Sequence, residues 1–204
     1  FCRRIIGWLS STFVGLRYRF NFEVPIDWSK PYIICPNHTS NLDITAMVLL
    51  CPVDFSFIGK IELLDNPVTG LFFRTIDIPL NRQSKMSAFK AFKQAEQYLR
   101  QGRSMVIFPE GRIGDVFPPR LHDFKNGPFK LAIDTGIPII PVVIQNAWKL
   151  YWDEAKQFGS RPGTILVDVL RPIETAGLQS DQDVMLRDQI YQLIKKRWEF
   201  VAQV

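Results

Sequence analysis

The residue types best suited to acid–base chemistry lie in one polar segment, Asn37-His38-Thr39-Ser40-Asn41-Leu42-Asp43. An imidazole held by a carboxylate keeps one ring nitrogen protonated and presents the other as a general base. On an uninterrupted helix, residues five apart lie about 140° apart, so His38 and Asp43 meet only if 39–41 form a loop and the first helical turn. With that turn, the segment predicts that His38 acts as a general base that removes a proton from a hydroxyl group. Without it, His38 is a loop histidine and Asp43 an early-helix acid favoured by the dipole.

A second set of polar residues suits the binding of phosphate. Phe108-Pro109-Glu110-Gly111-Arg112 follows an apolar run, and it combines a carboxylate, a glycine that admits close backbone approach and a guanidinium. Further cations lie beside other predicted elements: Lys60 after 55–59, Arg82 after 76–80, and Lys125 before a predicted helix. Each of these charges alone is typical of a solvated surface, so the interpretation depends on the fold bringing them together.

The elements that must position these residues alternate between strands and helices. Strands are expected at 32–35, 55–59, 76–80, 104–108, 137–144 and 164–170. Helices are expected from residue 42 onwards and at 84–101, 129–135 and 181–201. This alternation predicts a single α/β domain over 1–204 with a mixed or largely parallel sheet flanked by helices. In such sheets ligands bind at the ends of the strands, which is where the two polar segments fall.

The first twenty residues combine large apolar side chains with four arginines and no acidic residue. The pattern predicts an amphipathic basic helix over residues 1–25. Two interpretations are equally open: a helix that lies at a membrane interface, with Arg3, Arg4, Arg17 and Arg19 facing anionic lipid, or an ordinary helix packed on the domain.

Composition narrows the function classes without choosing among them. The chain carries 25 Lys and Arg against 20 Asp and Glu, and 11 of the basic residues against 5 acidic ones fall in 74–130. Such basic regions suit lipid, phosphate or nucleic acid. Three cysteines without a CxxC pair and two histidines make a disulfide framework or a metal site improbable. No apolar stretch approaches the about 20 residues that a membrane-spanning helix needs.

Taken in order, these segments resemble the glycerolipid acyltransferase family typified by 1-acylglycerol-3-phosphate acyltransferase. Asn37, His38 and Asp43 match its first signature, an Asn-His pair followed by four residues and Asp. The further matches are Phe108 to Gly111, the Pro-containing strand 137–142, Lys60 to Leu63, Arg82, and Phe124 to Gly127. The resemblance covers roughly residues 30–145, and the ordered set is more specific than any single motif.

The sequence departs from the family pattern at one point. Arg112 stands where threonine is usual, and Ile113 stands where arginine is usual. A Glu-Gly-Arg-Ile variant resembles that of acyltransferases acting on lysophospholipids with larger head groups. Either the arginine is displaced by one residue and still reaches phosphate, or the acceptor differs.

The resemblance implies transfer of a fatty acyl group from acyl carrier protein or coenzyme A to the free hydroxyl of a lysophospholipid, 1-acylglycerol-3-phosphate first among them. His38 would take the hydroxyl proton, and Asp43 would orient the ring and support the imidazolium. The residues that would bind the acceptor phosphate lie near strand ends: Lys60, Arg82, Glu110, Gly111, Arg112 and Lys125. Among them, Glu110 would bind an adjacent hydroxyl or hold the arginine fork. No metal, cofactor or covalent acyl-enzyme is required, because a thioester is already activated. The enzyme would work at an anionic membrane surface on the cytoplasmic face.

Two other function classes are weighed against this one. A membrane-associated phospholipid-binding module would keep the fold without turnover, but binding alone does not need the base that His38 and Asp43 would form. A sequence pI of about 9.2 and the Trp and Phe content suggest nucleic-acid binding. The chain has no recognisable nucleic-acid reading motif, so no nucleic-acid partner is expected.

Overall fold

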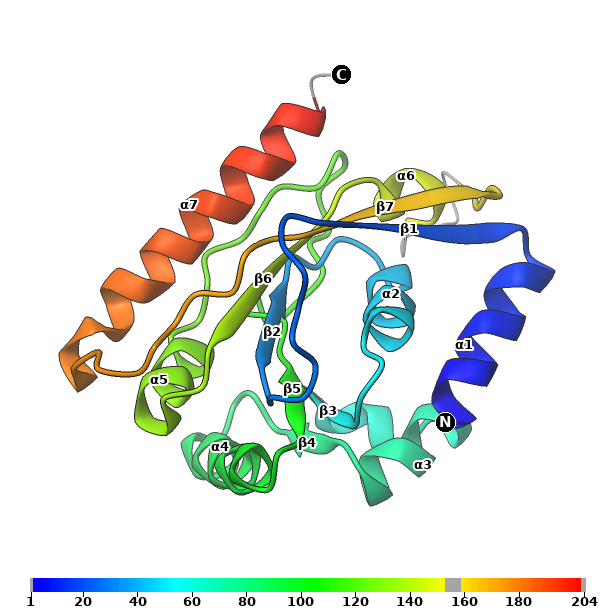
Figure 1. Ribbon diagram of the computed structural model, residues 1–204. Coiled ribbons are helices and arrows are strands. Elements are labelled where there is room, and N and C mark those ends of the chain that lie inside the picture. Colours follow the sequence, from blue (N-terminus) through cyan, green and yellow to red (C-terminus); the bar gives the residue numbers. More distant parts are fainter. Residues whose placement is uncertain (1, 153–158, 203–204) are drawn as a thin grey trace.

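Seven strands form one sheet in a computed structural model that describes residues 2–152 and 159–202 (Figure 1). The strand order is β1-β7-β6-β2-β5-β3-β4, and every neighbouring pair is parallel except β6 with β7. The strands are β1 (Leu16–Phe22), β2 (Ile33–Pro36), β3 (Phe55–Lys60), β4 (Ile78–Leu80), β5 (Ser104–Val106), β6 (Ile139–Ile144) and β7 (Gly163–Val169). The predicted α/β class with a mixed, largely parallel sheet is confirmed.

Helices cover both faces of the sheet (Figure 1). They are α1 (Cys2–Phe13), α2 (Leu42–Leu50), α3 (Pro67–Thr75), α4 (Lys85–Arg100), α5 (Gly127–Thr135), α6 (Ala147–Leu150) and α7 (Asp183–Ala202). Short 3-10 turns at Ile61–Leu64 and Ser180–Gln182 precede α3 and α7. Helix α2 packs on one face with α1 beside it, whereas α4, α5 and α7 cover the other.

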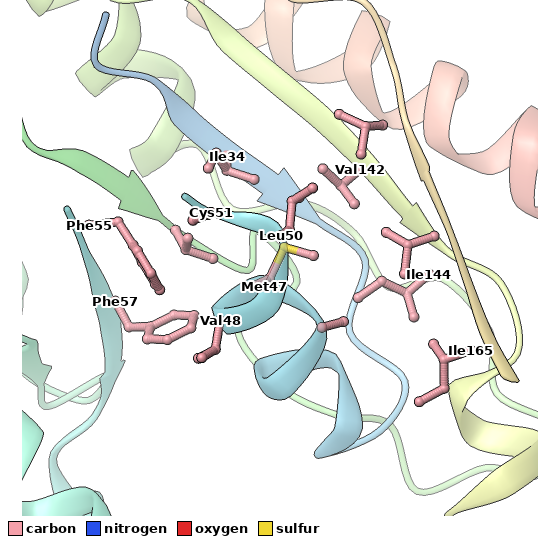
Figure 2. Close-up of a cluster of buried hydrophobic side chains, with 14 of the residues drawn as sticks. Ile34, Met47, Val48, Leu50, Cys51, Phe55, Phe57, Val142, Ile144 and Ile165 are labelled. Atoms are coloured by element: carbon pink, nitrogen blue, oxygen red, sulfur yellow. The ribbon is translucent and has the colours of Figure 1, made fainter. Parts of the chain in front are cut away.

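Two hydrophobic cores form because successive side chains of a strand point to opposite faces of a sheet. On β2, Ile34 belongs to the core under α2, whereas Ile33 and Cys35 belong to the core under α4, α5 and α7. Figure 2 shows Met47 and Val48 of α2 packed between β2, β6 and β3. Burial on both sides explains why these strands are continuous apolar runs in the sequence. This burial also fixes the positions of the strand ends from which the polar loops extend.

The helices expected at 84–101, 129–135 and 181–201 are confirmed within a few residues by α4, α5 and α7. Helix α3 was not expected. Its start signal is nevertheless strong: the Asn66 side chain accepts hydrogen bonds from the amides of Val68 and Thr69, and Pro67 occupies the first turn.

The extent predicted for the N-terminal helix was wrong. Helix α1 ends at Phe13, Gly15 takes the left-handed region at φ 72°, and residues Leu16–Phe22 form β1 instead. In β1, Tyr18 and Phe20 pack towards the core in alternation with exposed arginines, the period of two that marks a half-buried strand. Among the described residues, no helix combines the length and apolarity needed to cross a bilayer.

Candidate active site

Four adjacent parallel strands bring separate segments of the chain to one edge of the sheet. The loop after β2 carries His38, and the loop after β5 carries Arg112. Strand β3 ends at Lys60, and Arg82 follows β4 by two residues. Because β2, β5, β3 and β4 are neighbours in the sheet and run the same way, their carboxyl ends lie together.

The turn required for a base–acid pair is present. Helix α2 begins at Leu42, and the Nδ1 atom of His38 lies 3.1 Å from Oδ2 of Asp43. The same oxygen accepts the amide N–H groups of Thr39 at 2.6 Å and Ser40 at 2.8 Å. The Asp43 side chain is fully buried. A carboxylate acceptor keeps the proton of neutral His38 on Nδ1, which leaves the lone pair on Nε2.

His38 is also held through its ring face and its backbone. Its ring stacks on Phe108 with centroids 4.0 Å apart and planes inclined by 24°. Its amide N–H donates to Oε1 of Glu110 at 2.6 Å. The preceding residue, Asn37, exchanges two side-chain hydrogen bonds with the backbone of Ile144 on β6, at 2.7 and 3.0 Å. The loop that carries the base is therefore tied to the segments on both sides of β2.

Glu110 lies behind His38. Glu110 is only 2% exposed, and its second carboxylate oxygen accepts the amide N–H of His122 at 2.8 Å. Burial raises the pKa of Glu110 to about 8, although the two amide donors act in the opposite direction. Both oxygens bind backbone amides, and contact of Glu110 with the acceptor stays a prediction.

A cavity of about 560 Å³ lies in front of His38, between α1, α2, α3 and β3. It brings together four of the predicted site residues: His38, Lys60, Arg82 and Arg112. Its apolar walls come from side chains of all these elements, among them Ile6, Ile44, Val48, Phe57, Leu63 and Phe72. A space that joins His38, the three predicted cations and apolar walls suits an amphiphile with an anionic head group.

Gly111 and Lys125 lie outside the walls of this cavity. Gly111 adopts φ 72°, a conformation that favours glycine, immediately before the cavity-lining Arg112. Lys125 is exposed, and its amide donates to the carbonyl of Pro109 at 2.8 Å. The backbone of both residues shapes the loop, and their contact with a phosphate stays a prediction.

The sequence of this chain matches the family model described as Acyltransferase over residues 17–145. The chain belongs to this acyltransferase family. Among its relatives, the human 1-acyl-sn-glycerol-3-phosphate acyltransferase beta is 31% identical over 207 residues, which cover 98% of this chain and 72% of that protein. An uncharacterized acyltransferase of Schizosaccharomyces pombe is 32% identical over 171 residues, 83% of this chain and 61% of that protein.

A solved structure shares the fold of this acyltransferase. The crystal structure of the 1-acyl-sn-glycerophosphate (LPA) acyltransferase PlsC from Thermotoga maritima matches with a TM-score of 0.77 and 23% identity, covering 98% of this chain and 78% of that chain. The acyltransferase described here spans little more than half of several relatives, such as 56% of the Saccharomyces cerevisiae 1-acyl-sn-glycerol-3-phosphate acyltransferase.

The acyltransferase cavity also contains an ion pair that the sequence patterns did not predict. Arg3 of α1 and Asp77, just before β4, both line it, and Nη1 of Arg3 lies 2.9 Å from each carboxylate oxygen of Asp77. Arg3 also donates to the carbonyl of Phe55 at 2.9 Å, and its guanidinium lies over the Phe55 ring. For Arg3, this ion pair favours the interpretation of a helix packed on the domain over a side chain that faces anionic lipid. An acidic residue at the start of an apolar strand was the available signal.

Proposed function

We propose that this acyltransferase moves a fatty acyl group from a thioester to the free hydroxyl of 1-acylglycerol-3-phosphate, giving phosphatidic acid. The family and the relatives named for that acceptor support the reaction class. One observation of the structure carries the proposal. His38, bound at Nδ1 by Asp43 at 3.1 Å, lines an apolar-walled cavity together with Lys60, Arg82 and Arg112.

The pair supplies the proton transfer that the reaction needs. Nε2 of His38 takes the proton of the acceptor hydroxyl while the hydroxyl oxygen attacks the thioester carbonyl carbon. The tetrahedral intermediate then collapses, the carbon–sulfur bond breaks, and the imidazolium returns the proton to the leaving thiolate. Asp43 keeps the ring oriented and stabilises its positive charge. The proposal requires no metal, cofactor or acyl-enzyme, because the thioester is already activated.

The cations explain why the acceptor would carry a phosphate. Lys60, Arg82 and Arg112 reach the cavity from three different strand ends, and two guanidinium groups suit phosphate geometry. Arg112 and Ile113 both line the cavity, so the displaced arginine still reaches it. This placement favours 1-acylglycerol-3-phosphate, and a lysophospholipid with a larger head group is the second candidate acceptor.

The donor is an acyl thioester of acyl carrier protein or coenzyme A, and the reaction takes place at an anionic membrane surface on the cytoplasmic face. The exposed apolar side chains of α1 support this placement. They lie on the helix that forms one wall of the cavity, and they include Ile5, Ile6, Trp8, Leu9 and Phe13. An acceptor embedded in lipid would then enter from the surface that α1 contacts.

The test is transfer of a labelled palmitoyl group from acyl carrier protein and from coenzyme A to a panel of lysophospholipids in mixed micelles. The panel contrasts 1-acylglycerol-3-phosphate with lysophospholipids of larger head group, and each reaction is run with wild type and His38→Ala. We expect product with the phosphate-terminated acceptor, lost in the variant. A folded, lipid-binding protein that forms no product with any donor and acceptor would instead be a phospholipid-binding module.

A further inference from the structure

The carboxylate of Glu110 bridges two loops of the site. One oxygen accepts the amide N–H of His38 at 2.6 Å, and the other accepts the amide N–H of His122 at 2.8 Å. His122 is 84 residues from His38 in the chain, so Glu110 connects the loop after β2 with the far part of the loop after β5. The bridge is buried and lies outside the cavity walls.

The second loop is long and irregular. No helix or strand occurs between Val106, the end of β5, and Gly127, the start of α5. Loops of this length inside a compact fold are uncommon and are usually functional. Residues 112–115 of this loop line the cavity, among them the cation Arg112.

His122 connects Glu110 with the cavity-lining part of its loop. The imidazole packs directly against Gly114, where even one added carbon would meet the His122 Nε2 atom. Because Gly114 lies two residues from Arg112, the position of His122 constrains the backbone that presents this cation. A second tie within the loop, from the Lys125 amide to the Pro109 carbonyl at 2.8 Å, closes the loop near Glu110.

We propose that Glu110 is a positioning residue that sets the distance between the general base and the loop of Arg112. The inference rests on the proposed function, because it assigns Glu110 a role within the same reaction. An acceptor that binds Arg112 through its phosphate would then present its hydroxyl to His38 without further adjustment of either loop. Misplacement of a reacting group by about 1 Å can cost a hundredfold in rate.

The bridge requires an acceptor at both positions. Glutamate has lone pairs on both oxygens, whereas glutamine offers one carbonyl oxygen and one NH₂ group, which cannot accept. In Glu110→Gln one of the two amides therefore loses its partner, although the side chain keeps its size. Glu110→Asp retains both oxygens on a side chain one methylene shorter and is the second variant, should Glu110→Gln fail to fold. Glu96→Gln makes the same chemical change on α4, at a half-buried carboxylate outside the cavity walls that pairs with Lys93 and Arg100, and serves as the matched control.

The experiment measures kcat and the acceptor KM of these variants alone and in a His38→Ala background. We expect Glu110→Gln to lower kcat by about 10–100-fold, and the effect to vanish on the residual rate of His38→Ala, because groups that act through one another are non-additive. We also expect the imidazole NMR signals of His38 to shift in Glu110→Gln, with circular dichroism showing that the variant is folded. Glu96→Gln should match wild type in all three readouts.

Two results would overturn the inference. If Glu110→Gln raises only the acceptor KM and its effect adds to that of His38→Ala, Glu110 binds the acceptor directly. Unchanged kcat and unchanged His38 signals would show that the bridge is dispensable. The NMR readout does not depend on turnover, so a wild type that fails to transfer acyl groups would contradict the proposed function while the bridge is still tested.

Discussion

Two buried aspartates each bind a basic side chain that lines the cavity. Asp43, beyond the carboxyl end of β2, binds His38 at 3.1 Å. Asp77, at the amino end of β4, binds Arg3 at 2.9 Å. The first pair leaves Nε2 of His38 available for a proton. In the second pair, Arg3 binds the carboxylate and a backbone carbonyl and lies over aromatic rings. Only the first pair therefore keeps a reactive atom for the proton transfer proposed above.

The largest difference between the pairs should appear in turnover. We expect His38→Ala to reduce acyl transfer by about 10²–10⁴-fold, the usual contribution of a positioned general base. The measurement is kcat/KM for the acceptor in mixed micelles, with circular dichroism to show that the variant is folded. Near wild-type turnover would remove His38 from the mechanism and erase the contrast with Arg3.

Breaking the pair of Arg3 and Asp77 should reduce the stability of the fold instead. Arg3→Ala leaves a buried carboxylate without its partner, which typically lowers the free energy of unfolding by about 3–5 kcal/mol. Chemical denaturation measures this loss, and kcat per folded molecule should fall far less than in His38→Ala. Arg4→Ala, at an exposed position on the same helix, is the control, with a change within about 0.5 kcal/mol. A stable Arg3→Ala variant with His38-like loss of turnover would reverse the assignment of the two pairs.

The cations that line the cavity with His38 should act on acceptor binding. We expect Arg82→Ala and Arg112→Ala each to raise the acceptor KM by roughly 10–100-fold, since a hydrogen bond to a charged group contributes about 1.5–3 kcal/mol. Saturation curves at fixed donor concentration provide the measurement. Arg100→Ala, on the exposed end of α4, should leave the curve unchanged. Superimposable curves for all three variants would argue against phosphate binding at this edge.

The structural pair should also show a specific pH dependence. Burial raises the pKa of Asp77, and the Arg3 guanidinium opposes that rise. Removing Arg3 raises the pKa further, so folded Arg3→Ala holds its proton to higher pH than folded wild type. Stability falls with pH wherever the folded state binds more protons than the unfolded state. The difference in the free energy of unfolding between wild type and Arg3→Ala should therefore widen as pH rises above the pKa of Asp77 in folded wild type. A difference that stays constant across pH would contradict the interaction of Arg3 with Asp77.

The smallest effect concerns the arginine next to Arg3 in the chain. Arg4 is exposed on α1 and is free of the Asp77 pair, so it is the one of the two that can face anionic lipid. We expect Arg4→Ala to weaken binding to anionic vesicles by roughly fivefold, from about 1 kcal/mol per basic residue near the surface. Sedimentation with anionic and neutral vesicles measures it. Equal binding of wild type and variant to anionic vesicles would separate α1 from the membrane surface.

Most of the fold followed from local patterns. The buried strands are recognisable in the sequence as apolar runs, because both faces of the sheet are covered. Helices α4, α5 and α7 show helical spacing of their core residues. The N-terminal segment was predicted as one helix because its arginines and aromatics suit a basic helix. The alternation in Leu16–Phe22 forms a strand only because β7 pairs with it. Helix α3 was missed although Asn66 and Pro67 mark its beginning.

The sequence by itself determined which residues could do the chemistry, because the types and the spacing of the Asn-His and Phe-Pro-Glu-Gly segments suit a base and an anion site wherever they meet. Only the tertiary structure decided how they meet. Parallel pairing brought His38, Lys60, Arg82 and Arg112 to one cavity, and burial turned Glu110 towards two backbone amides. The reason is physical: distances between segments far apart in the chain depend on strand order and packing, which local sequence patterns do not encode.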